Sequence, residues 1–201
     1  MRLARILILI ATTAAAVLAA TAPARAALLE TDVEDERLLL SGSIEGPFAA
    51  AQWNQLGIKS VRVQAHWWEI APDGRSTHKP KGFNASDPSA PGYNWGPVDH
   101  SIAVVVGAGL KPMLTITGPG PVWASSSPRR HNIYYKPKPS EFARFATAAA
   151  KRYGAMVDRY LIYNEPNQKG WLQPQWSCRF CIFGGTFPAA AGDTRYRCSR
   201  P

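Results

Sequence analysis

Cysteine is scarce in this sequence, and its distribution limits the covalent or metal chemistry that the chain can carry. Three of the 201 residues are cysteines, and all three follow Ser177. Cys178 and Cys181 form one C-x-x-C pair, but a second pair that would complete a zinc site is missing. A small loop disulfide between these two cysteines is therefore favoured over half of a zinc site, with Cys198 left over. We expect no metal ion and no cofactor.

The segment that holds the cysteines, residues 177–201, also lacks the regular patterning of the rest. It contains Gly184-Gly185, an alanine run at 189–191 and four arginines, with no further alternation of helix and strand. One interpretation is an irregular tail with the small disulfide. The other is a reading frame that is shifted or ends early after residue 176.

Acidic residues are few relative to basic ones. The chain has 14 aspartates and glutamates against 23 lysines and arginines, which gives a formal net charge of +9. The basic residues are scattered along the sequence and do not form a stripe or a dense cluster. We therefore expect no nucleic-acid partner.

Long apolar runs are absent except at the N-terminus. Residues 6–20 are apolar, follow Arg2 and Arg5, and precede the small-residue pattern Ala24-Arg25-Ala26. A run of 15 residues is short for a spanning helix, so a secretory signal peptide over 1–26 is favoured over an uncleaved membrane anchor. The mature chain is predicted to be secreted, without stable membrane association.

Helical and extended patterns alternate from residue 38 to residue 163. A helical pattern that ends at a glycine and is followed by a short strand occurs three times, with the glycines at Gly57, Gly109 and Gly154. The predicted strands are 38–44, 58–64, 111–117 and 157–163, and the predicted helices begin at Pro47, at Pro97 and at Ser140 as N-cap. This alternation predicts an α/β fold with a parallel sheet of about four strands and three helices.

The fourth predicted strand ends in two polar side chains that could carry chemistry. Aromatic and β-branched residues at 157–163 favour a strand, and Pro166 prevents its continuation, so Asn164 and Glu165 lie at the C-terminal edge. In barrels of parallel strands this edge holds the catalytic groups. Asn164 could bind a hydroxyl and Glu165 could transfer a proton. Alternatively, the pair caps the next helix and forms a salt bridge.

The connections that follow the predicted strands are long and rich in tryptophan. They span 67–96 and 118–139, and long loops at this edge commonly bind ligands. Six of the seven tryptophans lie in segments after strands, at positions 67, 68, 95, 123, 171 and 176. Flat indole faces suit the stacking of sugar rings. For any single indole, packing of a loop is the competing interpretation, but as a set they predict a carbohydrate cleft.

Arg62 places a charge inside an otherwise apolar strand. Its neighbours Val61 and Val63 share the opposite face, so Arg62 is predicted to point into the barrel, with Glu165 as a candidate partner. His66 and Glu69 follow at the predicted mouth of the site. The alternative for these two is that they are solvated loop residues.

These features together resemble glycoside hydrolase clan A, the retaining (β/α)8 glycosidases, in particular family 39-like and family 5-like, cellulase-type secreted enzymes. The resemblance covers residues 38–176 and implies that residues 27–176 form the N-terminal half of a TIM barrel. It implies that Asn164 binds the sugar 2-hydroxyl and that Glu165 is the general acid/base. The substrate-binding side chains would be Arg62, His66, Trp67, Trp68, Trp123 and Trp171.

The sequence departs from this family in two respects. A retaining enzyme needs a second carboxylate as nucleophile, which the family places on strand seven, but only 36 residues follow Glu165. Thr117-Gly118-Pro119 also stands where family 5 usually has a histidine. Two functions remain open: a glycoside hydrolase in an incomplete form without its nucleophile, or a noncatalytic carbohydrate-binding or degenerate barrel fragment.

Overall fold

The computed structural model describes residues 30–175. The predicted signal peptide at 1–26 and the cysteine-containing tail, with Cys178 and Cys181, lie outside the described residues. Within 30–175, none of the helices has both the length and the apolar character required to cross a membrane.

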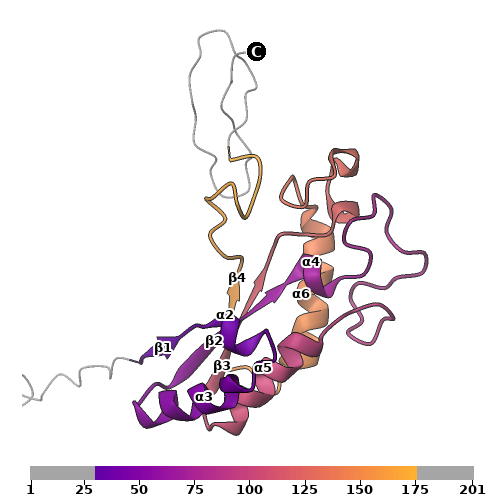
Figure 1. Ribbon diagram of the computed structural model, residues 1–201. Helices are drawn as coiled ribbons and strands as arrows, with labels where there is room; N and C mark the ends of the chain where they lie inside the picture. The colour runs from indigo at the N-terminus through magenta and orange to yellow at the C-terminus, as the bar shows by residue number, and fades with distance from the viewer. Residues whose placement is uncertain (1–29, 176–201) are drawn as a thin grey trace, which may run out of the picture.

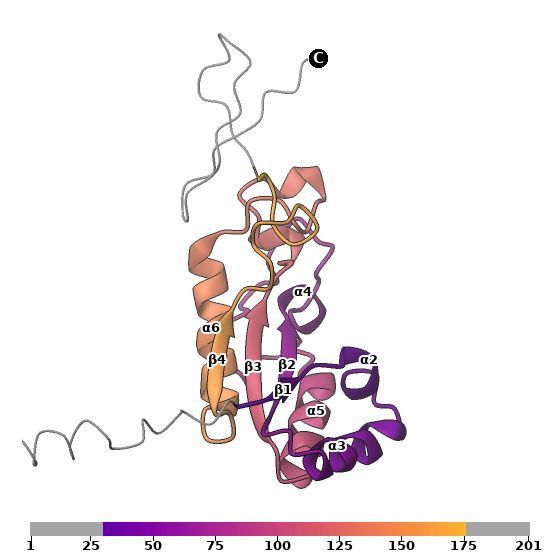
Figure 2. The ribbon, with the colours of Figure 1, turned by 90° about the vertical axis from the view of Figure 1, so that its left-hand side faces the viewer.

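Four parallel strands form one sheet in the order β1-β2-β3-β4 (Figure 2). Their bounds are Asp32–Val33 for β1, Ser60–His66 for β2, Lys111–Thr117 for β3 and Arg159–Ile162 for β4. Because each strand pairs with the next along the chain and all run in one direction, every connection must cross back over the sheet. This arrangement is an α/β fold compatible with part of a (β/α)8 barrel, as the sequence predicted.

Three long helices provide these crossovers and lie on the same face of the sheet (Figure 1). They are α3 (Glu45–Gln55), α5 (Gly96–Gly107) and α6 (Pro139–Tyr153). Short elements occupy the connections: α2 (Glu36–Leu39), α4 (Trp67–Ile70), and the 3-10 helices η1 (Val122–Ala124) and η2 (Pro128–Arg130). The predictions for the three long helices and the last three strands are confirmed, with bounds shifted by a few residues.

The alternation of side chains along β2 separates an apolar face from a polar one. Val61, Val63 and Ala65 are buried in the hydrophobic core with the helices, whereas Arg62 and Gln64 point to the opposite face. The register pairs Arg62 with Met113, Gln64 with Thr115 and His66 with Thr117 across β2 and β3. We call this second face, which would line the interior of a barrel, the inner face.

The prediction of a first strand at 38–44 is wrong. The leucines at 38 and 39 belong to α2, and the first strand is the two-residue β1 upstream. Asp35 caps α2, since its side chain accepts a hydrogen bond from the Leu38 amide at 3.1 Å. An N-cap aspartate followed by Glu36 in the first turn is a helix-start signal, and it outweighs the short leucine run.

The three helices end at the predicted glycines, but with two different backbone conformations. Gly57 and Gly109 adopt positive φ values of +85° and +74°, which glycine reaches without steric penalty. Gly154 stays in the right-handed region at φ −56°. The predicted cap at Ser140 is also wrong, because α6 begins at Pro139 and its N-cap is Lys138.

In the described residues the sheet has two open edges, and β4 exposes apolar side chains at one of them. Ile162 is 62% exposed and Tyr160 is 37% exposed. A strand of a parallel sheet is normally covered on both faces. The sheet edge at β4 therefore lacks the neighbouring strand and helix that a closed barrel would place there.

The segment that leads into β1 is tied to the far side of the sheet. Glu30 forms an ion pair with Arg159 of β4 at 2.5 Å and approaches Lys111 at 4.0 Å. The carbonyl of Thr31 accepts a hydrogen bond from the amide of Lys59. The first described residues thus run across the N-terminal end of the sheet.

Candidate functional site

Arg62 is the centre of a hydrogen-bond network on the inner face of the sheet. Its Nε donates to Oγ1 of Thr115 in β3 at 2.8 Å, and its Nη2 donates to Oδ1 of Asn164 at 2.7 Å. The third group, Nη1, donates to Oε2 of Glu34 at 3.0 Å. Side chains on β3 and after β1 and β4 thus converge on one rigid guanidinium, which fixes their orientation.

The predicted pairing of Arg62 with Glu165 is wrong. The carboxylate that balances Arg62 belongs to Glu34, which directly follows β1. The Arg62 side chain is only 21% exposed, so its charge needs a partner, and Glu34 provides it. On the β4 side, the Arg62 guanidinium binds Asn164 and not Glu165.

Sequence reasoning missed three members of this network: Thr115, Gln64 and Glu34. Glu34 also accepts a hydrogen bond from Nε2 of Gln64 at 2.6 Å, so one carboxylate orients two inner-face side chains. Gln64 was detectable, since it lies two residues from Arg62 in the same strand and must share its face. Glu34 was not, because the strand that it follows was predicted in the wrong place.

The backbone around Asn164 is strained. Tyr163 and Glu165 both adopt positive φ, +64° and +42°, a conformation that typically costs about 1–2 kcal/mol for a residue with a side chain. The amide of Asn164 donates to Oγ1 of Thr117 at 2.9 Å, which holds the strained segment against β3. Such strain is concentrated at functional sites, where the surrounding structure maintains it.

Tyr163 anchors the segment that follows β4. Burial raises the pKa of its hydroxyl to about 12, and this hydroxyl donates to the carbonyl of Trp171 at 3.2 Å. It lies directly against Gly118, where an added Cβ would come within 2.1 Å of the tyrosine oxygen. Glycine at 118 therefore leaves room for Tyr163, and Tyr163 in turn positions Trp171.

Glu165 receives a hydrogen bond from an indole but is not enclosed by a set of them. Nε1 of Trp171 donates to its Oε2 at 3.0 Å, and the residue is exposed. The Trp171 ring also stacks on the ring of His66, with centroids 5.9 Å apart and planes inclined by 15°. The structure thus brings together Glu165, Trp171 and His66, three of the predicted site residues.

His66 is held in turn by a carboxylate that the sequence did not indicate. Its Nε2 lies 2.8 Å from Oε1 of Glu36 in α2. Burial alone would lower the pKa of the imidazole, but the hydrogen bond and charge of Glu36, the charge of Glu69 and the Gly118 backbone raise it above 6.5. The fold therefore favours the protonated imidazolium at this position.

This pKa shift predicts a pH-dependent stability. The stabilisation from protonated His66 is fully present below the unfolded-state pKa of about 6.5 and is lost as the pH rises through the higher folded-state pKa. The difference in unfolding free energy between wild type and His66→Gln should therefore shrink between pH 5 and pH 8. Urea titrations across this range measure it. The exposed His100 of α5, replaced in the same way, is the control, and an equal trend in His100→Gln would contradict the assignment.

Two predicted substrate-binding tryptophans are instead part of the core, so their assignment to a cleft is wrong. Trp67 is 0% exposed and Trp123 is 3% exposed. Trp67 stacks on Phe145 of α6 with centroids 5.8 Å apart, and Nε1 of Trp123 donates to the carbonyl of Pro72 at 3.0 Å. The long loop after β2 folds over the helices, which buries these indoles. Trp68 is partly buried beneath the guanidinium of Arg75, and its role stays a prediction.

The arrangement around Asn164 defines what the site can do. Arg62 donates a hydrogen bond to the side-chain carbonyl oxygen of Asn164, which fixes the orientation of that amide. The NH2 group of Asn164 can therefore donate to a ligand acceptor such as a hydroxyl oxygen. The next residue, Glu165, presents an exposed carboxylate that can give or take a proton. In residues 30–175 we find no group of three or more His, Cys, Asp or Glu side chains that could hold a metal ion.

Comparisons with known proteins add a likeness of fold. No family model matches the chain, and no curated protein matches it in sequence. Among solved structures, it is similar to the crystal structure of Fpglu1 from Fervidobacterium pennivoraus, with 20% identity and a TM-score of 0.41. The match covers 66% of this chain and 34% of that one, so the chain spans about a third of its length.

Proposed function

We propose that this chain is a secreted glycoside hydrolase in an incomplete form. It supplies the general acid/base of a retaining active site but not the nucleophile. The observation that carries the proposal is the Asn164 amide, held by Arg62 beside the Glu165 carboxylate at the C-terminal ends of the strands. An oriented amide donor next to an exposed carboxylate suits a substrate with hydroxyl groups and a reaction that needs a proton. A polysaccharide or oligosaccharide meets both conditions.

The missing part of the site is the nucleophile. Retaining hydrolysis uses two carboxylates about 5–5.5 Å apart. Among the described residues, two carboxylates that contact this network already have partners, since Glu34 pairs with Arg62 and Glu36 with His66, whereas Glu69 acts on His66 through its charge without a direct bond. We therefore assign Glu165 as the acid/base and assign no residue in 30–175 as the nucleophile.

Noncatalytic carbohydrate binding is the second candidate, and one observation favours it. Glu165 is solvent-exposed, whereas a general acid at neutral pH is usually partly enclosed. Binding without turnover would need only the oriented amide and the aromatic side chains.

An assay that supplies the nucleophile from solution separates the two candidates. The purified chain is incubated with aryl glycosides and azide, and the glycosyl azide is measured by mass spectrometry. In this reaction the azide nitrogen bonds to the anomeric carbon, the bond to the phenol oxygen breaks, and that oxygen takes the proton of Glu165. We expect azide-dependent product and little hydrolysis without azide. Saccharide binding with no azide product would support the noncatalytic candidate, and turnover without azide would show that the chain contains its own nucleophile.

A further inference from the structure

The segments that follow β3 and β4 are joined into one unit. The amide of Lys136 donates to the carbonyl of Gln173 at 2.7 Å, and the amide of Gln173 donates to the carbonyl of Tyr134 at 2.8 Å. The side chains of Asn132 and Gln173 are also hydrogen-bonded at 2.9 Å. The segments 118–138 and 163–175 therefore present a fixed surface above the strand ends, and the second of them carries Glu165.

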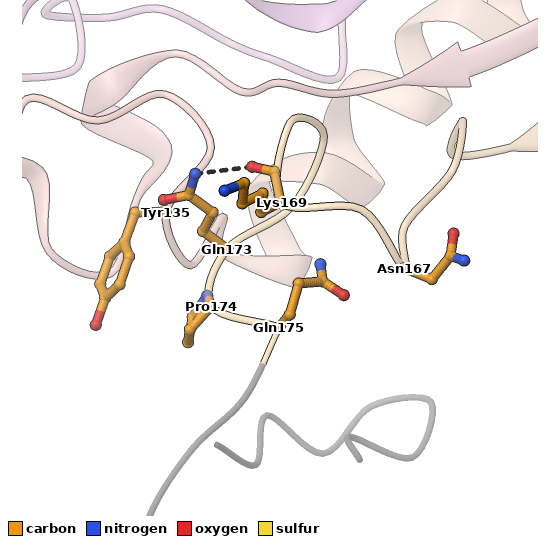
Figure 3. A pocket seen from close by; sticks show the side chains of 6 residues that line it. All are labelled: Tyr135, Asn167, Lys169, Gln173, Pro174 and Gln175. Carbon is orange, nitrogen blue, oxygen red and sulfur yellow. Dashed lines mark hydrogen bonds between the residues drawn. The ribbon is translucent and has the colours of Figure 1, made fainter. Parts of the chain in front are cut away.

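An open cavity of about 490 Å³ lies in this surface and faces solvent on one side. Figure 3 shows Tyr135 at one side and Asn167 at the other, with the remaining lining residues between them. The cavity is lined by Tyr135, Asn167, Lys169, Gln173, Pro174 and Gln175. Amides, one ammonium group and an aromatic ring supply hydrogen bonds for hydroxyl groups and an apolar face for a sugar ring.

The two segments carry an excess of positive charge. They contain five lysines and arginines but a single carboxylate, that of Glu165; the five are Arg129, Arg130, Lys136, Lys138 and Lys169. Within residues 30–175, none of the five forms a salt bridge. The guanidinium of Arg130 lies over the ring of Tyr135 at 4.5 Å, and the ammonium of Lys136 lies 5.8 Å from the same ring.

The carboxylates of the site lie on the opposite side. Glu34 and Glu36 follow β1, and Glu69 lies in α4 after β2. The first two are paired with Arg62 and His66. At the C-terminal edge of the sheet the carboxylates toward β1 are thus largely balanced, whereas the cations toward β4 lack protein carboxylates in the described structure.

We propose that the cavity binds an anionic saccharide, one whose sugar units carry carboxylate or sulfate groups, on the segment that carries the acid/base Glu165. Lys169 and Arg130 would pair with the anionic groups, and the amides of Asn167 and Gln175 would bind hydroxyls. This inference rests on the proposed function and names its substrate class. It explains why basic side chains gather on the two segments that frame Glu165.

Calorimetric titration of the 201-residue chain tests the proposal with four probes: a hexagalacturonate, a sulfated hexasaccharide, the neutral cellohexaose and a single-stranded DNA hexamer. At least one anionic saccharide should bind about tenfold more tightly than cellohexaose, as expected for one added charge-assisted hydrogen bond. The two anionic arms distinguish carboxylate from sulfate. Equal binding of cellohexaose, or tighter binding of the DNA, would overturn the proposal.

Matched variants show whether the cavity is responsible. Lys169→Met should weaken binding of the preferred anionic saccharide about tenfold, whereas Lys59→Met, an exposed lysine directly before β2 at the opposite end of the sheet, should change it less than about twofold. Equal losses in both variants would indicate nonspecific attraction and contradict the proposal. Anion binding without azide-dependent turnover would overturn the proposed function alone, and turnover of neutral glycosides without anion preference would overturn this inference alone.

Discussion

Replacing Glu165 with Gln should lower the rate of glycosyl azide formation by about 10²–10⁴-fold for substrates with poor leaving groups, the range typical of acid assistance. Glutamine keeps the size of the side chain and can still accept the hydrogen bond from Trp171, but it has no proton to give. The shape of the site and the position of this side chain are therefore preserved, whereas its ability to protonate the leaving group is lost. The measurement is the initial rate with phenyl glycosides at fixed azide concentration.

The dependence on the leaving group is the sharper part of this prediction. A 2,4-dinitrophenolate departs without a proton, so Glu165→Gln should have little effect on 2,4-dinitrophenyl glycosides. Glu45→Gln, an exposed carboxylate in the first turn of α3, is the matched control and should leave both rates unchanged. Equal loss with both leaving groups would assign Glu165 to binding or folding. If the wild type turns over without azide and Glu69→Gln abolishes that turnover, Glu69 is the second carboxylate and the chain is not incomplete.

Replacing Trp67 with Ala should lower the free energy of unfolding by about 3–5 kcal/mol, as is typical for removal of a large buried aromatic side chain. Trp67 is fully buried and packs against Phe142 and Phe145 of α6 and the edge of Trp123. The cavity would lie between the long post-β2 loop and α6. Because small domains are stable by only about 5–15 kcal/mol, this loss can unfold the chain, and Trp67→Phe provides a milder step that remains measurable.

Trp171 provides the contrasting case, since it is half-buried and contacts the site. Trp171→Ala should lower the unfolding free energy by less than about 1.5 kcal/mol, because one partly exposed hydrogen bond and a ring stack are lost. It should reduce saccharide binding while the fold is retained. Urea denaturation and calorimetry of the two variants measure both quantities. A stable Trp67→Ala together with an unfolded Trp171→Ala would reverse our assignment of core and site.

The regular elements were predictable because their signals are local. Helical spacing in α5 and α6 and the apolar run of β3 are visible in short windows, and β3 was placed at Lys111–Thr117 without error. β1 was not predictable in this way, since two residues show no period. Its strand character depends on pairing with Ser60 and Val61, which are almost 30 residues away in the sequence.

The contents of the site were predictable only in part. The alternation in β2 placed Arg62 on the inner face, but its partner could not be read from the sequence. Positive φ at Tyr163 and Glu165 breaks the alternation of side chains after β4, so Asn164 turns toward Arg62. The roles of the tryptophans could not be predicted for a similar reason. An indole in a long loop can stack on a sugar or pack against a helix, and the path of the loop, which the sequence does not show, buries Trp67 and Trp123 in the core.

The ion pair between Glu30 and Arg159 has a consequence for how the chain folds as it is synthesised. The two residues are 129 positions apart, and this pair connects the segment before β1 to the last strand. β1 itself contributes only two paired residues, but Glu34 and Glu36 that follow it bind Arg62 and His66 of β2, so most contacts of this segment can form once β2 has been synthesised. The exposed pair with Arg159 can form only after β4 has left the ribosome, and it therefore joins the two ends of the sheet last.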